Sequence, residues 1–366
     1  MLSLMLGIGE NMARKEKSNG NSIIDLTTMP VVNAASGTKD EAEFQAYSED
    51  EEKAVFNYIN ALYKQVRAEL NANNGSPSSL TQPTLKTSPN DYADGAIASY
   101  SSFFNRIQVY QRGYKMYTDM KRAEANGDTY MADKLRYEFT HVIGHELGHA
   151  LTHAAFFDSE NGYSYREGLW RRKDDGLAEV IGFYIAQKVN GRPVDNDSVA
   201  DAMLEAVKSK QEAFLEYNEK LKAEWPTLTN KEKEARMGDI DLHATRSVYY
   251  DYAIIGFATA LKSNPNMSLA EVIKIALESS DQLDGLDKYV LNISGSALEL
   301  EKIDKSKSLG RMLRGKGSID EKQAAEQMRL QGELSQEMLD KIAAMTGRTG
   351  KADMVYEMEV KHFLVE

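Results

Sequence analysis

Two histidines and a glutamate within five residues are the part of this sequence best suited to chemistry. His145 and His149 are four positions apart in the segment HELGH, and Glu146 directly follows the first histidine. On a helix this spacing places both imidazoles on one face, one turn apart, so that both can bind one metal ion. Glu146 is then placed to hold a metal-bound water and to take its proton as a general base. The segment therefore predicts a zinc site in a hydrolase.

Two further histidines continue this pattern along the chain. His141 and His153 extend the series to four histidines at intervals of four residues. They cannot all bind one ion, because each helical turn moves the side chains about 5.4 Å along the axis. We therefore expect His141 and His153 to flank the site rather than to bind its metal.

The third metal ligand is expected to be a carboxylate. The chain has no cysteine, so a thiolate ligand is excluded. A longer form of the motif supplies a third histidine six residues after the second. Here Ala155 stands at that position, and Thr152 replaces the glycine that the longer motif requires.

A second segment supplies carboxylates and carries a family resemblance. The segment Asp175-Gly176-Leu177-Ala178-Glu179, taken with HELGH, resembles the gluzincin clan of zinc peptidases, in which a second helix carries a glutamate ligand. The metallopeptidase domain of anthrax lethal factor and the leukotriene-hydrolase-like aminopeptidases are similar in this respect. The resemblance covers roughly residues 95–261. It implies a zincin-like fold, a Zn²⁺ ion, and a peptide or protein substrate.

The resemblance leaves the identity of the third ligand open. In the register of the clan, Asp175 binds zinc and Glu179 is the carboxylate that hydrogen-bonds a ligand histidine. In the alternative, the longer Glu179 binds zinc and Asp175 orients a histidine or the helix N-terminus. Glu167 is a third candidate, because its separation from His149 is close to that in several gluzincins. Asp174 and Asp175 could also be simple helix caps.

A zinc hydrolase also needs a hydrogen-bond donor for the oxyanion that forms on the attacked carbonyl. Residues 248–253 resemble the gluzincin segment that supplies a tyrosine for this purpose. Tyr250 matches best, Tyr249 and Tyr252 lie close behind, and His243 is another candidate donor. Packing in the core is an equally good interpretation for each tyrosine taken singly.

The elements that would position these residues are mostly helical. Apolar residues at helical spacing, with Ser48 and Ser268 as expected capping residues, predict helices over residues 39–71, 132–157, 174–188, 194–225, 239–261, 269–277 and 318–345. Short strands are expected between residues 95 and 117, with a turn at Asn105, and a loop from residue 73 to 91. We predict a helix-dominated α+β chain with a small sheet before the motif helix. It divides into a flexible arm (1–38), a zincin-like catalytic domain (39–300) and a helical C-terminal segment (301–366).

The charge and the terminal segments limit the partners. A net charge of −12 over 366 residues argues against nucleic acid as a partner. The chain has no apolar run long enough to cross a bilayer. Residues 1–8 are apolar, but their charges follow rather than precede them, so a signal peptide is not expected and a cytoplasmic location is favoured. Met12 is an alternative start to Met1. The helix predicted over residues 194–225 is strongly charged and has a narrow apolar stripe, so most of its surface should face solvent. This helix, or the arm, could bind a protein partner.

Three hypotheses for the function remain at this point. In the first, the chain is a zinc metallopeptidase with Glu146 as general base and Tyr250 as oxyanion donor. In the second, it is a catalytically silent zincin-fold protein that acts as a binding or assembly component of a larger complex. In the third, it is a helical interaction protein without metal. The intact Glu146 favours the first, because a protein without turnover does not need the base.

Overall fold

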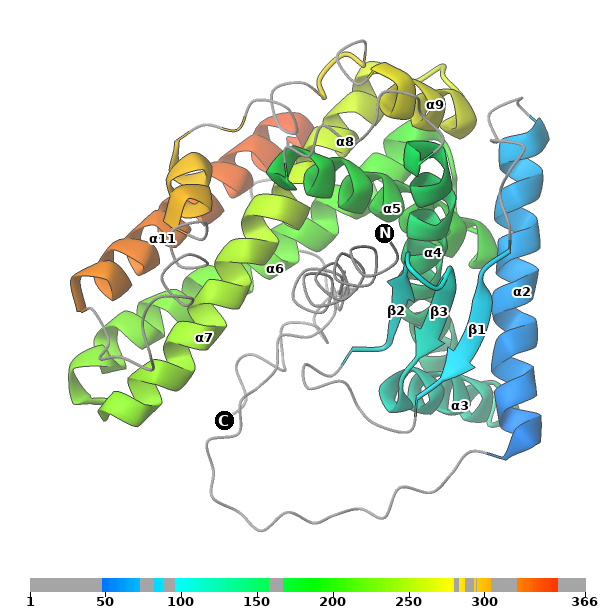
Figure 1. Cartoon of the computed structure of the whole chain (residues 1–366), viewed down its shortest axis with the longest axis horizontal. Coiled ribbons are helices and arrows are strands. Elements are labelled where there is room, and N and C mark those ends of the chain that lie inside the picture. Colours follow the sequence, from blue (N-terminus) through cyan, green and yellow to red (C-terminus); the bar gives the residue numbers. More distant parts are fainter. Residues whose placement is uncertain are drawn as a thin grey trace, which may run out of the picture.

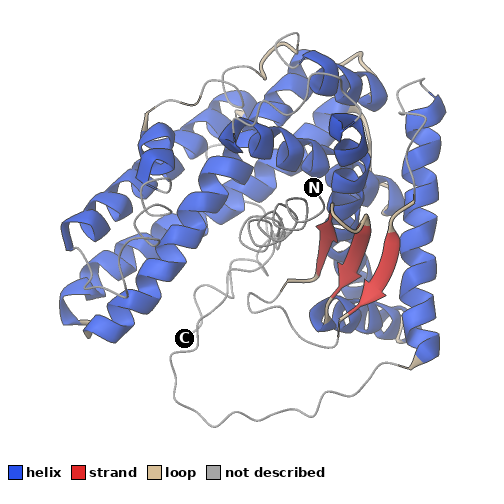
Figure 2. Ribbon diagram, viewed as in Figure 1, coloured by secondary structure: helices blue, strands red, loops and turns tan. Residues whose placement is uncertain are grey.

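The computed structural model describes residues 48–72, 82–88, 96–157, 167–279, 283–286, 293, 295–303 and 321–347. The arm of residues 1–38, both candidate start residues, and the side chains of His153 and Glu167 lie outside this description. Figure 1 shows a small sheet beside α2, with α6, α7 and α11 gathered on the other side of the molecule. Figure 2 shows how strongly helices dominate. The predicted class, a helix-dominated α+β chain with a small sheet, is confirmed.

The described elements follow one another in this order: α2 (Glu49–Ala72), β1 (Thr84–Thr87), β2 (Ala98–Ser101), β3 (Arg106–Val109), α3 (Gln111–Ala125), α4 (Thr129–Phe157), α5 (Glu167–Val189), α6 (Asn196–Glu224), the 3₁₀ turn η1 (Trp225–Thr227), α7 (Asn230–Arg246), the π-helical turn η2 (Ser247–Asp251), α8 (Tyr252–Ser263), α9 (Leu269–Ser279), a short helix over residues 296–303, and α11 (Glu321–Thr346). Within the described residues, every helix is too short or too polar to span a bilayer.

Helix caps predicted from the sequence form at two helix starts. At α2, the Ser48 hydroxyl oxygen accepts the Glu51 amide at 3.2 Å, and the Glu51 carboxylate accepts the Ser48 amide at 2.9 Å. Ser268 makes the same reciprocal pair with Glu271 at the start of α9. Each pair satisfies two of the amides that a helix N-terminus leaves without partners.

The sheet has the strand order β1-β3-β2, with β2 antiparallel and β1 parallel to β3. The predicted turn between β2 and β3 is confirmed at Asn105, whose φ of 42° lies in the left-handed region. Around the sheet, two elements differ from the prediction. Strand β1 lies in the expected loop of residues 73–91, and α3 occupies residues where strands were expected. Tyr114, Tyr117 and Met120 recur at helical spacing and are buried. This helical spacing was overlooked when strands were predicted for these residues.

Helices α4 and α5 make the most extensive helix–helix contact among the described elements. Small residues allow this approach. A Cβ on Gly148 would lie 2.6 Å from the Cα of Ala178, and a Cβ on Gly144 would lie 3.0 Å from the Cα of Gly182. Gly148 therefore keeps α4 slim enough for α5 to approach it. The close approach brings the carboxylates of α5 against the histidines of α4.

Helix α6 corrects the expectation that the charged helix 194–225 faces solvent. Its polar residues Lys208, Gln211 and Asn218 are buried, because α5, α8 and α11 cover it. Ser335 of α11 donates to the Gln211 side-chain oxygen at 2.6 Å, and the Asn218 amide donates to the Met328 carbonyl at 2.9 Å. The stripe appeared narrow because hydrogen bonds, rather than apolar contacts, make part of this interface.

Candidate metal centre

The imidazoles of His145 and His149 face each other inside the molecule. Their Nε2 atoms lie 2.8 Å apart, and the two side chains are 0 % and 2 % exposed. Both residues belong to α4, where Val142, Ile143 and Leu147 are buried in the core and fix the rotation of the helix. The predicted convergence of the two histidines is therefore present.

Asp175 of α5 completes a group of three potential ligands. Its Oδ1 lies 3.5 Å from the Nε2 of His149. One ligand atom from each of His145, His149 and Asp175 falls within 4.8 Å of the other two, and all three residues are buried. Two imidazoles and one carboxylate are a donor set that zinc accepts in catalytic sites, where a fourth position stays open.

A carboxylate also holds the other nitrogen of each imidazole. Glu179 Oε1 lies 3.0 Å from the Nδ1 of His145, and Asp174 Oδ2 lies 2.9 Å from the Nδ1 of His149. The Asp174 contact is a hydrogen bond, whereas the Nδ1 of His145 and the Oε1 of Glu179 lie at ion-pair distance without hydrogen-bond geometry. A proton on Nδ1, attracted by the carboxylate, leaves the lone pair on Nε2. Two lone pairs at 2.8 Å repel each other, so this arrangement calls for a cation or a shared proton between the rings. The geometry thus fits a metal ion bound by both Nε2 atoms.

The charges of these groups are set by burial and by one another. Burial opposes ionisation of Glu179, but His145 and His141 together outweigh burial and hold its pKa well below the usual value. Burial lowers the pKa of His145 to about 4. Burial also acts to lower the pKa of His149, but Asp174 and Asp175 overcome it and raise the value to about 9.

Glu179 contacts two histidines of α4 and is not part of the group formed by His145, His149 and Asp175. Its second oxygen, Oε2, lies 2.9 Å from the Nε2 of His141. His141 is therefore beside the centre and bonded to a carboxylate, consistent with the flanking position expected for it. Of the two assignments considered for α5, this geometry corresponds to the one with Asp175 on the metal and Glu179 behind His145.

Glu146 is fully buried next to this group. Within the described part of the chain, neither of its carboxylate oxygens makes a hydrogen bond of ordinary geometry. Burial raises its pKa to about 8, although the backbone amide of Tyr100 lies near enough to act in the opposite direction. Tyr110 donates to the Ile97 carbonyl, and in the antiparallel register Ala98 and Tyr100 then direct their amides away from β3. The outer edge of β2 therefore faces Glu146.

The candidate oxyanion donors lie in and near η2. Tyr250 is buried at 4 % exposure, with Tyr249 and Tyr252 beside it in the sequence, and η2 packs against α5. The role of Tyr250 stays a prediction. His243 belongs to α7, and its ring contacts Phe214 of α6. Its Nδ1 shares a hydrogen bond of 2.9 Å with the Ser247 hydroxyl.

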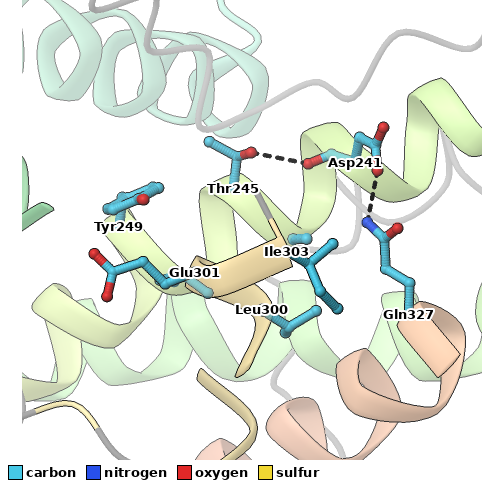
Figure 3. A pocket seen from close by; sticks show the side chains of 9 residues that line it. Asp241, Thr245, Tyr249, Leu300, Glu301, Ile303 and Gln327 are labelled. Atoms are coloured by element: carbon cyan, nitrogen blue, oxygen red, sulfur yellow. Dashed lines mark hydrogen bonds between the residues drawn. The ribbon is translucent and has the colours of Figure 1, made fainter. Parts of the chain in front are cut away.

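Tyr249 also lines a separate pocket, shown in Figure 3. The pocket has room for about one water molecule and lies between α7, η2, the helix of residues 296–303 and α11. Gln327 donates to the Asp241 carboxylate across it at 2.6 Å. Glu301, on another wall, lies 3.6 Å from Arg172, which precedes the carboxylates of α5. This ion pair connects the pocket wall to α5, three residues before Asp175.

The contact of Asp174 with His149 was not predicted from the sequence. Asp174 was considered only as a helix cap, but α5 begins at Glu167, so Asp174 lies inside the helix and touches His149. Two successive carboxylates on one helix are the signal that was available. On the far side of Asp174, Thr152 is a further contact that the sequence did not indicate.

Comparisons with known proteins return no relative. No model of a known family matches the chain, and no curated protein and no solved structure matches it.

Proposed function

We propose that this protein is a zinc-dependent metallopeptidase with a zincin-like fold, in which His145, His149 and Asp175 bind Zn²⁺ and Glu146 is the general base. The observation that carries the proposal is the pair of Nε2 atoms at 2.8 Å, with a carboxylate behind each ring. In zinc sites, a carboxylate or a carbonyl group typically accepts a hydrogen bond from the second ring nitrogen of each metal-binding histidine and so fixes its tautomer. When bound, zinc would supply Lewis acidity, which lowers the pKa of water and polarises a carbonyl.

Glu146 has the surroundings that a proton carrier requires. Its buried carboxylate is adjacent in sequence to His145 and is directed at no hydrogen-bond donor of ordinary geometry among the described residues. A metal cation bound beside it would favour the ionised carboxylate, which would then be available to take a proton from water and to deliver it to a leaving amine. Asp174 and Glu179 have the different task of holding the two histidines in the orientation that the metal needs.

A peptide is the substrate class that best suits the neighbouring strand. Backbone amides and carbonyls on the outer edge of β2 can pair with the backbone of an extended peptide and place its carbonyl beside Glu146. Tyr100, whose amide already faces Glu146, is the residue of β2 nearest to this chemistry. Tyr250 is proposed as the donor to the oxyanion.

One observation favours a second candidate, a catalytically silent zincin-fold protein that acts in binding or assembly. His145, Glu146, His149 and Asp175 are all at most 2 % exposed. A substrate can reach Glu146 only if the cover over the centre moves, and a protein that never opens would bind zinc without turnover.

The variant Glu146→Gln separates the two candidates. The exchange keeps the volume of the side chain and all the proposed metal ligands, but it removes the base. We expect wild type and variant to contain equal amounts of zinc, and only wild type to cleave a peptide library. Zinc in both proteins with cleavage by neither would support the silent protein. Equal cleavage by both would contradict the role of Glu146.

A further inference from the structure

Two polar residues of α4 contact the carboxylates that hold the histidines. His141 Nε2 lies 2.9 Å from Glu179 Oε2, and the Thr152 hydroxyl donates to Asp174 Oδ1 at 2.7 Å. The Thr152 hydroxyl is 3.3 Å from the carbonyl of His149, so Asp174 is its closer acceptor. Each carboxylate thus directs one oxygen to a histidine of the metal group and the other to a second residue of the same helix.

The same connections occur at both ends of the centre, although the contact of Glu179 with His145 is an ion pair without hydrogen-bond geometry. Glu179 joins His145 to His141, which lies one turn earlier on α4. Asp174 joins His149 to Thr152, which lies three residues later. Residues at these spacings share one helix face, so a single face of α4 carries the whole series. The carboxylates of α5 lie across that face.

A carboxylate that is held at both oxygens cannot rotate without breaking a hydrogen bond. One that is held only at the histidine can turn about its side-chain bonds and carry the ring with it. Thr152 and His141 are 1 % and 6 % exposed, so little water is at hand to replace either contact. Hydrogen bonds to charged groups in buried positions are also stronger than those between neutral groups.

The packing of α5 makes room for the ring of His141. A Cβ on Gly182 would lie 3.1 Å from Cδ2 of that ring and 2.9 Å from the carbonyl oxygen of His141. The ring of Phe183 lies against it, with the ring centroids 4.1 Å apart. The position of His141 is therefore determined from two sides, and its Nε2 meets Glu179 as a consequence.

We propose that Thr152 and His141 are positioning residues, which fix Asp174 and Glu179 and through them set the orientation of His149 and His145 for zinc. The inference rests on the proposed function, since it assigns these residues to the same metal centre. Neither residue binds the metal or touches the substrate. We therefore expect their substitution to weaken zinc binding by the folded protein. A loss of folding stability alone would not change that affinity.

Thr152→Val tests the proposal at one end of the centre. Valine has nearly the shape of threonine but lacks the hydroxyl, whereas Thr152→Ser keeps the hydroxyl and loses only a methyl group. Substitution of a residue that hydrogen-bonds a metal ligand typically weakens metal binding 10- to 100-fold. We expect zinc binding about tenfold weaker in Thr152→Val, near the low end of that range, and close to wild type in Thr152→Ser.

A matched control lies on the same helix. Thr140 is fully buried in α4, and its hydroxyl makes a hydrogen bond of 2.6 Å with the Tyr58 hydroxyl, away from the metal group. Thr140→Val therefore removes the hydroxyl group of an equally buried threonine, and we expect unchanged zinc affinity. At the other end, His141→Gln keeps an N–H for Glu179 and should retain affinity that His141→Leu loses.

A competition titration of zinc against a chelator, on the full chain, decides between the outcomes. Weakened binding in Thr152→Val and His141→Leu, with binding retained in the Ser, Gln and Thr140→Val variants, supports the proposal. If wild type binds zinc and Thr152→Val binds it equally well, the positioning role is wrong and the proposed function stands. If wild type binds no zinc, both are wrong.

Discussion

The Nε2 atom of His145 lies 2.8 Å from the Nε2 atom of His149, while the Nδ1 atom of each ring faces a carboxylate. This relationship joins two helices, because the histidines come from α4 and the carboxylates from α5. It depends on the close approach of those helices at Gly148 and Gly182. Neither the motif nor the packing alone would create the centre.

The third ligand can be identified by comparing Asp175→Asn with Glu179→Gln. Both exchanges keep the side-chain volume and remove one charge from a fully buried position. If Asp175 binds the metal and Glu179 supports His145, Asp175→Asn loses more zinc affinity, and Glu179→Gln loses roughly 10- to 100-fold. A zinc titration of both variants checks this order. The reverse order would assign the metal to Glu179.

The glycines of α4 offer a stability test that does not involve metal. A Cβ on Gly148 would lie 2.6 Å from a backbone atom of Ala178. We therefore expect Gly148→Ala to lower the free energy of unfolding by about 1–3 kcal/mol, as overpacking does. Urea denaturation in the presence of a chelator measures this without a contribution from bound metal.

Gly238 in α7 is the matched control for this exchange. No atom of the described residues lies within 4 Å of a Cβ placed there. Alanine should stabilise the helix at this position by about 0.5–1 kcal/mol, because glycine loses more backbone freedom on folding. Equal destabilisation in the Gly148 and Gly238 variants would show that the close approach of α4 and α5 is not responsible.

His243 should make the stability depend on pH. Burial lowers its pKa from 6.5 to about 3. Since the folded value lies below the unfolded value, the unfolded chain binds the proton more readily in this range. The contribution of His243 is fully present above pH 6.5 and is lost as the pH falls toward 3, with a slope of at most about 1.4 kcal/mol per pH unit.

The variant His243→Asn isolates this contribution. Asparagine retains a polar partner for the Ser247 hydroxyl but does not titrate. Urea denaturation at a series of pH values should show a smaller decrease in the free energy of unfolding for His243→Asn than for wild type between pH 6.5 and 4. Parallel curves for the two proteins would mean that His243 is accessible to protons in the folded state.

The motif helix could be predicted because its signals are local. The spacing of His145 and His149 and the apolar residues around them indicate one helix face without reference to the rest of the chain. The helix-dominated class follows from the same kind of pattern. Ser48 and Ser268 could be identified as caps because a capping residue acts within three positions of itself.

The remaining features depend on contacts that no local pattern contains. Strand β1 is short and half-exposed, and only its parallel pairing with β3 makes it a strand. The burial of α6 depends on α11, which lies far along the chain. Asp174 resembled a helix cap because the true start of α5, at Glu167, could not be located from the sequence.

The zinc content of the purified full chain tests the central claim most directly, with wild type compared with His145→Ala and with His243→Asn as a control histidine outside the centre. We predict that wild type and His243→Asn bind zinc stoichiometrically, and that His145→Ala, which loses one of the paired Nε2 atoms, binds almost none. Zinc content in His145→Ala equal to that of wild type would contradict the account.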